Sequence, residues 1–434
     1  MPRREFSMNE SAAPLHAVLV SVGTDGDIFP YVGLGVRLRE RGHRVTLVAS
    51  GHYEGLATMH GLEFRALISS EENFALLHHP DFWHPIKTAR LSAKWGVRFI
   101  ERQYALLAEL ARDETSVFIA VPAVFAVSLV HEKLGRPLAN LILQPWMLPS
   151  VIAPPVMPMF AFPSATPRPI VKLFWRALDV VGDVLVGREL NRIRASLELR
   201  PVRRIFQNWF SQQLVLGMFP EWFAPPPSDW PAQTRLAGFP LFDGVVNVSL
   251  PPGVQEFCLG GPPPVAFTFG TGMKHARERF HTAVDACAQA GVRGIFITRH
   301  RDQLPDSLPP HALHCPYAPF EKLFPQCGAI VHHGGIGTTA RALAAGLPQL
   351  IAPIGFDQMD NGTRVQKLGA GEWLKPKRQH SGDIAAALKI IMTPESQTRC
   401  RAIASRFRNG TDAFETAADL IEVLAIESQR NSIH

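Results

Sequence analysis

A short apolar run that opens into glycines constrains the fold of this chain more than any other feature. Residues 330–339 read IVHHGGIGTT, which predicts a buried strand, a tight turn and the first turn of a helix. The first N–H groups of a helix lack partners within it, and the helix dipole favours negative charge beside them. Glycine also lets a ligand approach the backbone closely. The segment therefore predicts an α/β fold with an anion site at this turn, although a turn that only joins two elements has the same pattern.

Apolar strands alternate with amphipathic helices along the rest of the chain, which is typical of parallel sheets covered by helices on both faces. A helix is expected at residues 31–41, ended by Gly42. Strands are expected at residues 15–22, 43–49, 117–121, 138–143, 265–269, 294–298, 329–332 and 349–353. A chain of 434 residues is long enough for two such domains, each with its own core. We expect domains at residues 1–224 and 265–410, a Pro- and Gly-rich linker at 225–264, and a final helical segment at 411–434.

The segments that flank the glycine turn suit the other parts of a nucleotide sugar. Upstream, Tyr317 provides an aromatic face beside two prolines, which suits a nucleobase. Downstream, Asp357 and Gln358 provide an acid and an amide, which suit sugar hydroxyls. Base, pyrophosphate and sugar binders thus follow one another in the order of the parts of the ligand. Tyr317 as an ordinary core residue is the alternative.

These motifs resemble the donor signature of the family 1 glycosyltransferases, the UDP-glycosyltransferase superfamily. The resemblance implies a donor site made of Thr271, Tyr317, Ala318, His333, Gly335, Gly337, Thr338, Asp357 and Gln358. One of the neighbouring histidines, His332 and His333, is expected to be structural, and the signature favours His333 as the ligand. Three strings, at residues 201–206, 219–226 and 238–244, are similar more narrowly to the rhamnosyltransferases of rhamnolipid biosynthesis.

The resemblance also implies a fold and a separate binding role for each domain. The fold would be GT-B, with two Rossmann-like, doubly wound α/β domains facing a central cleft. The N-terminal domain would bind the acceptor and the C-terminal domain the nucleotide sugar, and the final helix would cross back to the first domain.

Asp27 is the candidate catalytic base. It lies in the first strand-to-helix loop, where a carboxylate can take the proton of an attacking hydroxyl. Bacterial family members similarly carry Asp where plant relatives carry the catalytic histidine. A helix cap is the alternative role for Asp27. Asp25 and Asp27 also form the Asp-x-Asp motif of metal-dependent glycosyltransferases, in which two carboxylates hold a divalent ion against the pyrophosphate. Because the glycine turn already provides a phosphate site, a metal would be redundant. We therefore expect neither a metal nor another cofactor.

Apolar residues outside the donor signature suit an acceptor pocket. The proline-rich stretch 145–163 is too broken for a regular element, and it joins several aromatic residues elsewhere in the first half. The candidate acceptor residues are Phe82, Trp83, Trp146, Met147 and Phe160, with Trp95 as a further aromatic. Such a lining favours a lipid, sterol or polyketide alcohol over a polar sugar. A buried loop is the alternative interpretation of this stretch.

Composition adds weaker constraints. Five cysteines without a Cys-x-x-Cys spacing argue against a disulfide framework or structural zinc. The polar N-terminus resembles no signal peptide, and no apolar run is long enough to span a bilayer, so a cytoplasmic location is expected, with the inner face of the membrane as an option. Arginines at positions 192, 194, 200, 203 and 204 would form a solvated face or attract anionic lipid. They lack the interleaved aromatics of a nucleic-acid platform.

The sequence therefore predicts an inverting, metal-independent transfer of a hexose or deoxyhexose from a nucleotide sugar to a hydroxyl of an apolar acceptor. A nucleotide-sugar epimerase of the same fold and a non-catalytic nucleotide-sugar binding protein are the alternatives. Arg341 stands where family members that use a ribonucleotide commonly place Glu on the ribose, so the ribose is expected to lose its acidic partner. That departure favours a deoxyribose donor such as dTDP-rhamnose, with UDP-glucose as the other option.

Overall fold

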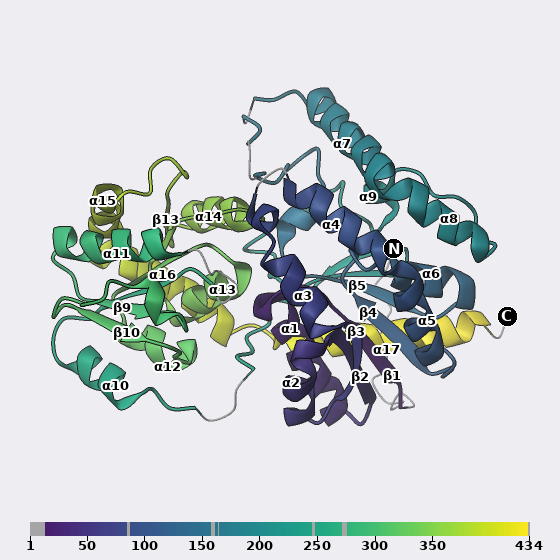
Figure 1. Cartoon of the computed structure of the whole chain (residues 1–434), viewed down its shortest axis with the longest axis horizontal. Helices are drawn as coiled ribbons and strands as arrows, with labels where there is room; N and C mark the ends of the chain where they lie inside the picture. The colour runs from purple at the N-terminus through teal and green to yellow at the C-terminus, as the bar shows by residue number, and fades with distance from the viewer. Residues whose placement is uncertain are drawn as a thin grey trace.

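Two parallel β-sheets organise the chain (Figure 1). The computed structural model describes residues 14–84, 87–157, 161–163, 165–244, 248–270 and 276–432. The first sheet has the order β3 (Glu63–Ile68), β2 (Arg44–Ser50), β1 (His16–Val20), β4 (Ser116–Ala120), β5 (Leu138–Ile142), β6 (Leu214–Gly217) and β7 (Thr234–Leu236). The second has the order β10 (Ala312–Cys315), β9 (Gly294–Ile297), β8 (Val265–Thr268), β11 (Ala329–His332), β12 (Gln349–Ile351) and β13 (Gly371–Trp373). The predicted class, two doubly wound α/β domains, is confirmed.

Helices cover both sheets. Those of the first half are α1 (Asp25–Glu40), α2 (Glu54–Met59), α3 (Ser70–Leu77), α4 (Lys87–Arg98), α5 (Ile100–Leu110), α6 (Phe125–Leu134), α7 (Arg168–Gly182), α8 (Arg188–Ser196) and α9 (Ile205–Asn208). A π-helical segment, η4 (Asp183–Gly187), joins α7 to α8. Those of the second half are α10 (Pro252–Leu259), α11 (Arg277–Ala290), α12 (Phe320–Leu323), α13 (Ile336–Ala345), α14 (Gln358–Lys367), α15 (Ser381–Ile391), α16 (Pro394–Arg408) and α17 (Ala413–Ser432).

Each sheet contains a central strand that pairs with a parallel strand on both sides. In the first, Val18 of β1 lies opposite Thr46 of β2 and Phe118 of β4. In the second, Val331 of β11 lies opposite Phe267 of β8 and Leu350 of β12. The strand order reverses between β1 and β4 and again between β8 and β11, and ligands bind at the carboxyl ends of strands at such points. Both reversals therefore direct their loops towards one cleft.

The helix that follows β1 begins earlier than the predicted start at residue 31. Its N-cap is Thr24, and Pro30 lies inside the helix. The N–H of Thr24 donates to the Asp27 carboxylate at 2.9 Å, and the N–H of Asp27 donates to the Thr24 carbonyl at 2.8 Å. This reciprocal capping starts the helix before Pro30. Because proline has no N–H, one backbone hydrogen bond is missing from the first part of the helix.

The segment between the domains is more structured than the predicted linker at 225–264. Strand β7 belongs to the first sheet, and α10 packs beside β10 of the second. The segment expected to be a linker therefore contributes one element to each half. Farther along, α17 leaves the second half and packs on α1, and in Figure 1 it runs beneath the first domain. Glu415 of α17 pairs with Arg37 of α1 and with Arg41, the C-cap of that helix, and Glu422 lies 2.9 Å from His43.

Candidate functional site

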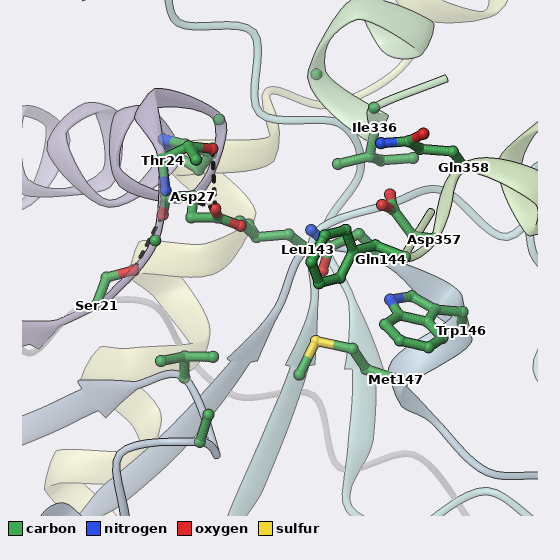
Figure 2. Close-up of a pocket in the computed structure, with 18 of the residues that line it drawn as sticks. Ser21, Thr24, Asp27, Leu143, Gln144, Trp146, Met147, Ile336, Asp357 and Gln358 are labelled. Carbon is green, nitrogen blue, oxygen red and sulfur yellow. Dashed lines mark hydrogen bonds between the residues drawn. The ribbon is translucent and has the colours of Figure 1, made fainter. Parts of the chain in front are cut away.

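One cavity of about 1310 Å³ opens between the two halves and reaches the carboxyl ends of both sheets. Figure 2 shows Asp27 on one wall, Asp357 and Gln358 on the opposite wall, and Gln144, Trp146 and Met147 beside the space between them. Every described residue of the expected donor site lines this cavity. Thr271 and Phe160 lie outside the described residues, as does the side chain of Trp83.

The turn from β11 to α13 presents free backbone donors to the cavity. Gly334 has φ of +98°, a conformation that glycine adopts without strain. A Cβ at Gly335, the N-cap of α13, would lie 2.6 Å from Nε2 of His333, whereas Gly337 has open space beside it. The unpaired N–H groups of this first helical turn, with the hydroxyl of Thr338 nearby, form a site suited to a phosphate.

The two histidines have different surroundings. Burial lowers the pKa of His332 to about 3; its Nε2 lies 3.0 Å from the Gln349 side-chain oxygen, and its Nδ1 accepts from Gly334 N at 3.1 Å. It is therefore a satisfied structural residue. His333 lines the cavity, and its Nδ1 has no hydrogen-bond partner among the described residues. Burial lowers the pKa of His333 to about 4, so its imidazole is neutral near pH 7.

Asp357 and Gln358 sit at a strained entry to α14. The preceding residue, Phe356, has φ of +53°, which is uncommon outside glycine and recurs at ligand sites. The Asp357 carboxylate accepts from Asn361 Nδ2 at 2.6 Å, and burial raises the pKa of this group to about 7. The side-chain oxygen of Gln358 accepts from the N–H of Ile354 at 2.6 Å, which leaves its NH₂ group for a ligand.

Asp27 performs the capping role that was the alternative to catalysis, and it also faces the cavity. Its Oδ2 accepts from Thr24 N at 2.9 Å and from Thr24 Oγ1 at 3.2 Å. Gly23 has φ of +130°, and a Cβ there would collide with the Asp27 carboxylate. Burial raises the pKa of Asp27, and hydrogen bonds from Thr24 and Gln144 oppose that rise. A carboxylate with a raised pKa is a stronger base, so capping and catalysis are compatible.

Asp25 has a partner of its own. Its Oδ1 accepts from the hydroxyl of Tyr53 at 3.1 Å. Among the described residues, no group of three or more His, Cys, Asp or Glu side chains is arranged to hold a metal ion.

The end of the cavity near Tyr317 contains an ion pair that the sequence did not predict. Arg341 Nη1 lies 2.5 Å from Asp243 Oδ1, and both side chains are largely buried. Burial, followed by the charge of Asp243, raises the pKa of Tyr317, and the charge of Arg341 opposes that rise. Asp243 therefore supplies a carboxylate beside Arg341 from another segment, and Arg341 engages it. The string at 238–244, which carries the narrower similarity, contains this residue.

Several of the candidate acceptor residues line the part of the cavity that the first half forms. Phe82 lines it and packs on Phe356 with ring centroids 5.7 Å apart, so the two halves touch there. Trp146 and Met147 line it as well. Trp95 lies on α4, does not line the cavity, and packs beside Phe99 instead. Lining residues that the sequence did not indicate include Gln144, Lys172, Trp175, Arg176, Phe206 and Trp209.

Comparison with known proteins decides the class. Residues 17–153 match the glycosyltransferase family 28 N-terminal domain, and residues 289–425 match the C-terminal domain of erythromycin biosynthesis protein CIII-like proteins. The chain is a GT-B glycosyltransferase. The N-terminal match is thus to family 28, whereas the donor signature had suggested family 1.

Relatives of this glycosyltransferase align along almost its whole length. An uncharacterized glycosyltransferase of Mycobacterium tuberculosis is 28% identical over 420 residues, 93% of this chain and 98% of the relative. The O-mycaminosyltylonolide 6-deoxyallosyltransferase of Streptomyces fradiae is 28% identical over 415 residues, 89% and 92% of the two chains. The crystal structure of the glycosyltransferase VinC in complex with dTDP superposes with a TM-score of 0.68 at 19% identity, covering 95% of this chain and 100% of VinC.

In the part of the glycosyltransferase that the structure describes, no helix combines the length and the apolar character needed to cross a membrane.

Proposed function

We propose that the enzyme transfers a hexose or deoxyhexose from a nucleotide sugar to a hydroxyl of an apolar, lipid-like or natural-product acceptor, with inversion at the anomeric carbon and without a metal. The observation that carries this proposal is the position of Asp27 opposite Asp357 and Gln358 in one cavity. A base for the acceptor and binders for the sugar thus stand on opposite walls. This arrangement suits an in-line displacement, in which the attacking and leaving oxygens lie on opposite faces of the sugar.

In this mechanism Asp27 accepts the proton of the acceptor hydroxyl as its oxygen bonds to the anomeric carbon. The bond from that carbon to the phosphate oxygen breaks, and the nucleoside diphosphate leaves with the electron pair. The N–H groups at the start of α13 and the hydroxyl of Thr338 stabilise the charge that develops on the diphosphate. Asp357 and Gln358 hold the sugar hydroxyls, and the neutral imidazole of His333 lines the same space.

The donor nucleotide is proposed to be of the dTDP type, with rhamnose as the first candidate sugar. The Asp243 carboxylate is engaged by Arg341 and is not free to accept bonds from a ribose 2′-hydroxyl. The dTDP bound to VinC, a protein of the same fold, agrees with this preference. A deoxyallosyl group is the sugar in the name of the Streptomyces relative, so deoxyhexoses belong in the test.

The acceptor half of the cavity argues against the alternatives. An epimerase needs no acceptor, yet the cavity continues past Trp146 and Met147 to Trp175 on α7. A protein that only binds nucleotide sugars needs no base, yet Asp27 faces the cavity opposite Asp357 and Gln358.

A matrix of donors and acceptors tests the proposal. UDP- and dTDP-hexoses, including dTDP-rhamnose, are incubated with hydroxy-fatty acyl, sterol and macrolide alcohols, and products are read by mass spectrometry, with the anomeric configuration from NMR. We expect an inverted glycoside on an apolar alcohol. Conversion of the donor in the absence of acceptor would identify an epimerase. Stabilisation of the protein by the donor without formation of any product would identify a binding protein. Retention of the anomeric configuration would exclude the single displacement.

A further inference from the structure

An exposed apolar stripe runs along α7 and into η4. Ile170, Leu173, Val180 and Val184 recur at helical spacing, with Ala177 between them, and the four larger side chains are 54, 66, 62 and 76% exposed. The opposite side of α7 is covered, since Val171, Asp179 and Gly182 are buried. A helix with this much apolar surface on its solvent side is poorly matched to water and marks a contact site.

The neighbouring helix α4 is exposed and basic. It packs beside η4, and Figure 1 shows it along the same edge of the first domain as α7. Its basic residues, Lys87, Arg90, Lys94 and Arg98, follow one another at three- and four-residue intervals, and it contains no acidic residue. Lys87 pairs with Asp81 at 3.1 Å. Arg90 and Lys94 have no carboxylate within 4.0 Å in the described ranges.

The positive net charge of the molecule is concentrated on α4 and α7. Together α4 and α7 carry seven basic residues and one acidic residue, so their net charge of +6 equals the formal net charge of the whole chain. Lys172 and Arg176 are exposed beside the apolar stripe and also line the cavity. Two of the arginines between residues 192 and 204 are less available, because Arg192 pairs with Glu101 and Glu189, and Arg194 is buried against Glu132.

We infer that the surface formed by α4 and the exposed face of α7, the α4–α7 surface, docks on an anionic lipid bilayer. Apolar side chains flanked by cations are the features that hold an amphipathic helix at the headgroup boundary, and basic residues near the surface add attraction to anionic lipid. Trp175 and Leu178, on the covered side of α7, line the acceptor end of the cavity. Docking therefore places that end of the cavity beside the bilayer, where apolar acceptors partition.

Vesicle flotation of the full chain tests this inference without donor or acceptor, so its outcome is independent of the proposed reaction. We expect the protein to float with vesicles of phosphatidylcholine mixed with phosphatidylglycerol, to float weakly with phosphatidylcholine alone, and to be released by high salt. Equal binding to both vesicles, or none to either, would overturn the inference.

Matched variants assign the binding to the surface. Leu173→Asp with Val184→Asp, and separately Arg90→Gln with Lys94→Gln, should each lower partitioning roughly 10-fold or more. The controls change equally exposed residues of the second domain: Ile390→Asp, where Ile390 is 61% exposed, and Lys377→Gln with Lys389→Gln. Transfer to a soluble, short acceptor and the thermal melt should be unchanged in all variants. If the controls lose binding as strongly, or if Leu173→Asp with Val184→Asp converts a dimer into a monomer by light scattering, the stripe contacts something other than lipid.

Discussion

Asp27 and Asp357 face each other across the cleft, and they are electrostatically coupled. Burial raises the pKa of Asp357 to about 7, and the negative charge of Asp27 contributes to the rise. The two groups come from different domains, so the cleft holds acidic side chains on two opposite walls.

Asp357 should make the ligand-free protein less stable as pH rises. Its folded-state pKa lies above that of an unfolded Asp, near 3.8, so the folded state holds the extra proton between about pH 4 and 7. The free energy of unfolding therefore falls as pH rises through this window, by at most about 1.4 kcal/mol per pH unit from this group, and levels off above it. Urea denaturation of Asp357→Asn should lack this slope, whereas the exposed control Asp285→Asn should keep it. Parallel profiles for Asp357→Asn and wild type would contradict the assignment.

Asp27→Asn should lower transfer by roughly 100-fold or more, which is the usual contribution of a general base, and leave donor affinity nearly unchanged. The amide oxygen can still accept from Thr24, so the helix start is preserved. Turnover is measured with calorimetry of donor binding, and Asp25→Asn is the control. Near wild-type turnover in Asp27→Asn would remove the residue from the mechanism. EDTA should leave the wild-type rate unchanged; strict dependence on manganese or magnesium would restore a metal role for Asp25 and Asp27.

Two glycines of the phosphate-binding turn should respond differently to alanine. Gly337 has open space, so Gly337→Ala should raise the free energy of unfolding by up to about 1 kcal/mol through its helix propensity. The added methyl group should nevertheless weaken nucleoside diphosphate binding, because it stands where phosphate approaches the backbone. Gly335→Ala should instead displace His333 and lower both quantities. Calorimetry and chemical denaturation separate the two effects, and unchanged diphosphate affinity in Gly337→Ala would place the phosphates elsewhere.

The pair of Arg341 and Asp243 should set the choice between ribose and deoxyribose. Arg341→Gln frees the Asp243 carboxylate to accept from a 2′-hydroxyl, so the affinity for UDP should rise relative to dTDP. Adding Asp243→Asn should abolish that gain, which distinguishes a ribose contact from a general change of shape. Competition binding of UDP against dTDP measures the ratio. A wild-type preference for UDP, or a gain that persists in the double variant, would rule out this role.

The central strands could be predicted from sequence because they are continuous apolar runs. All eight expected strands are present, with ends within two residues of the prediction. Strands β3, β6, β7, β10 and β13 were not expected. Four of these lie at sheet edges, and elements such as β7 and β13 have only three residues, which leaves too little apolar pattern to recognise.

The segments of the candidate donor site could also be picked out from sequence, because a glycine turn, an aromatic residue and an Asp-Gln pair are local signals, and the structure places them around one cavity. Contacts between distant segments had no such signal. Nothing local in the string around Asp243 indicates that it meets Arg341, and Gln144 gains importance only because β5 ends beside Asp27. The sequence of α7 has the pattern of an ordinary amphipathic helix, so it does not predict that an apolar face is exposed. The structure shows which face of α7 packs inwards.

The return of α17 to the first domain means that the polypeptide crosses between the halves twice, once before β8 and once before α17. Arg37 of α1 and Arg41, its C-cap, anchor the second crossing by ion pairs to Glu415. Two separate crossings restrain sliding and separation of the two halves, but they permit rotation of the halves about the line that joins the crossings. Any opening of the cleft that contains Asp27 and Asp357 is therefore expected to be a rotation about this line.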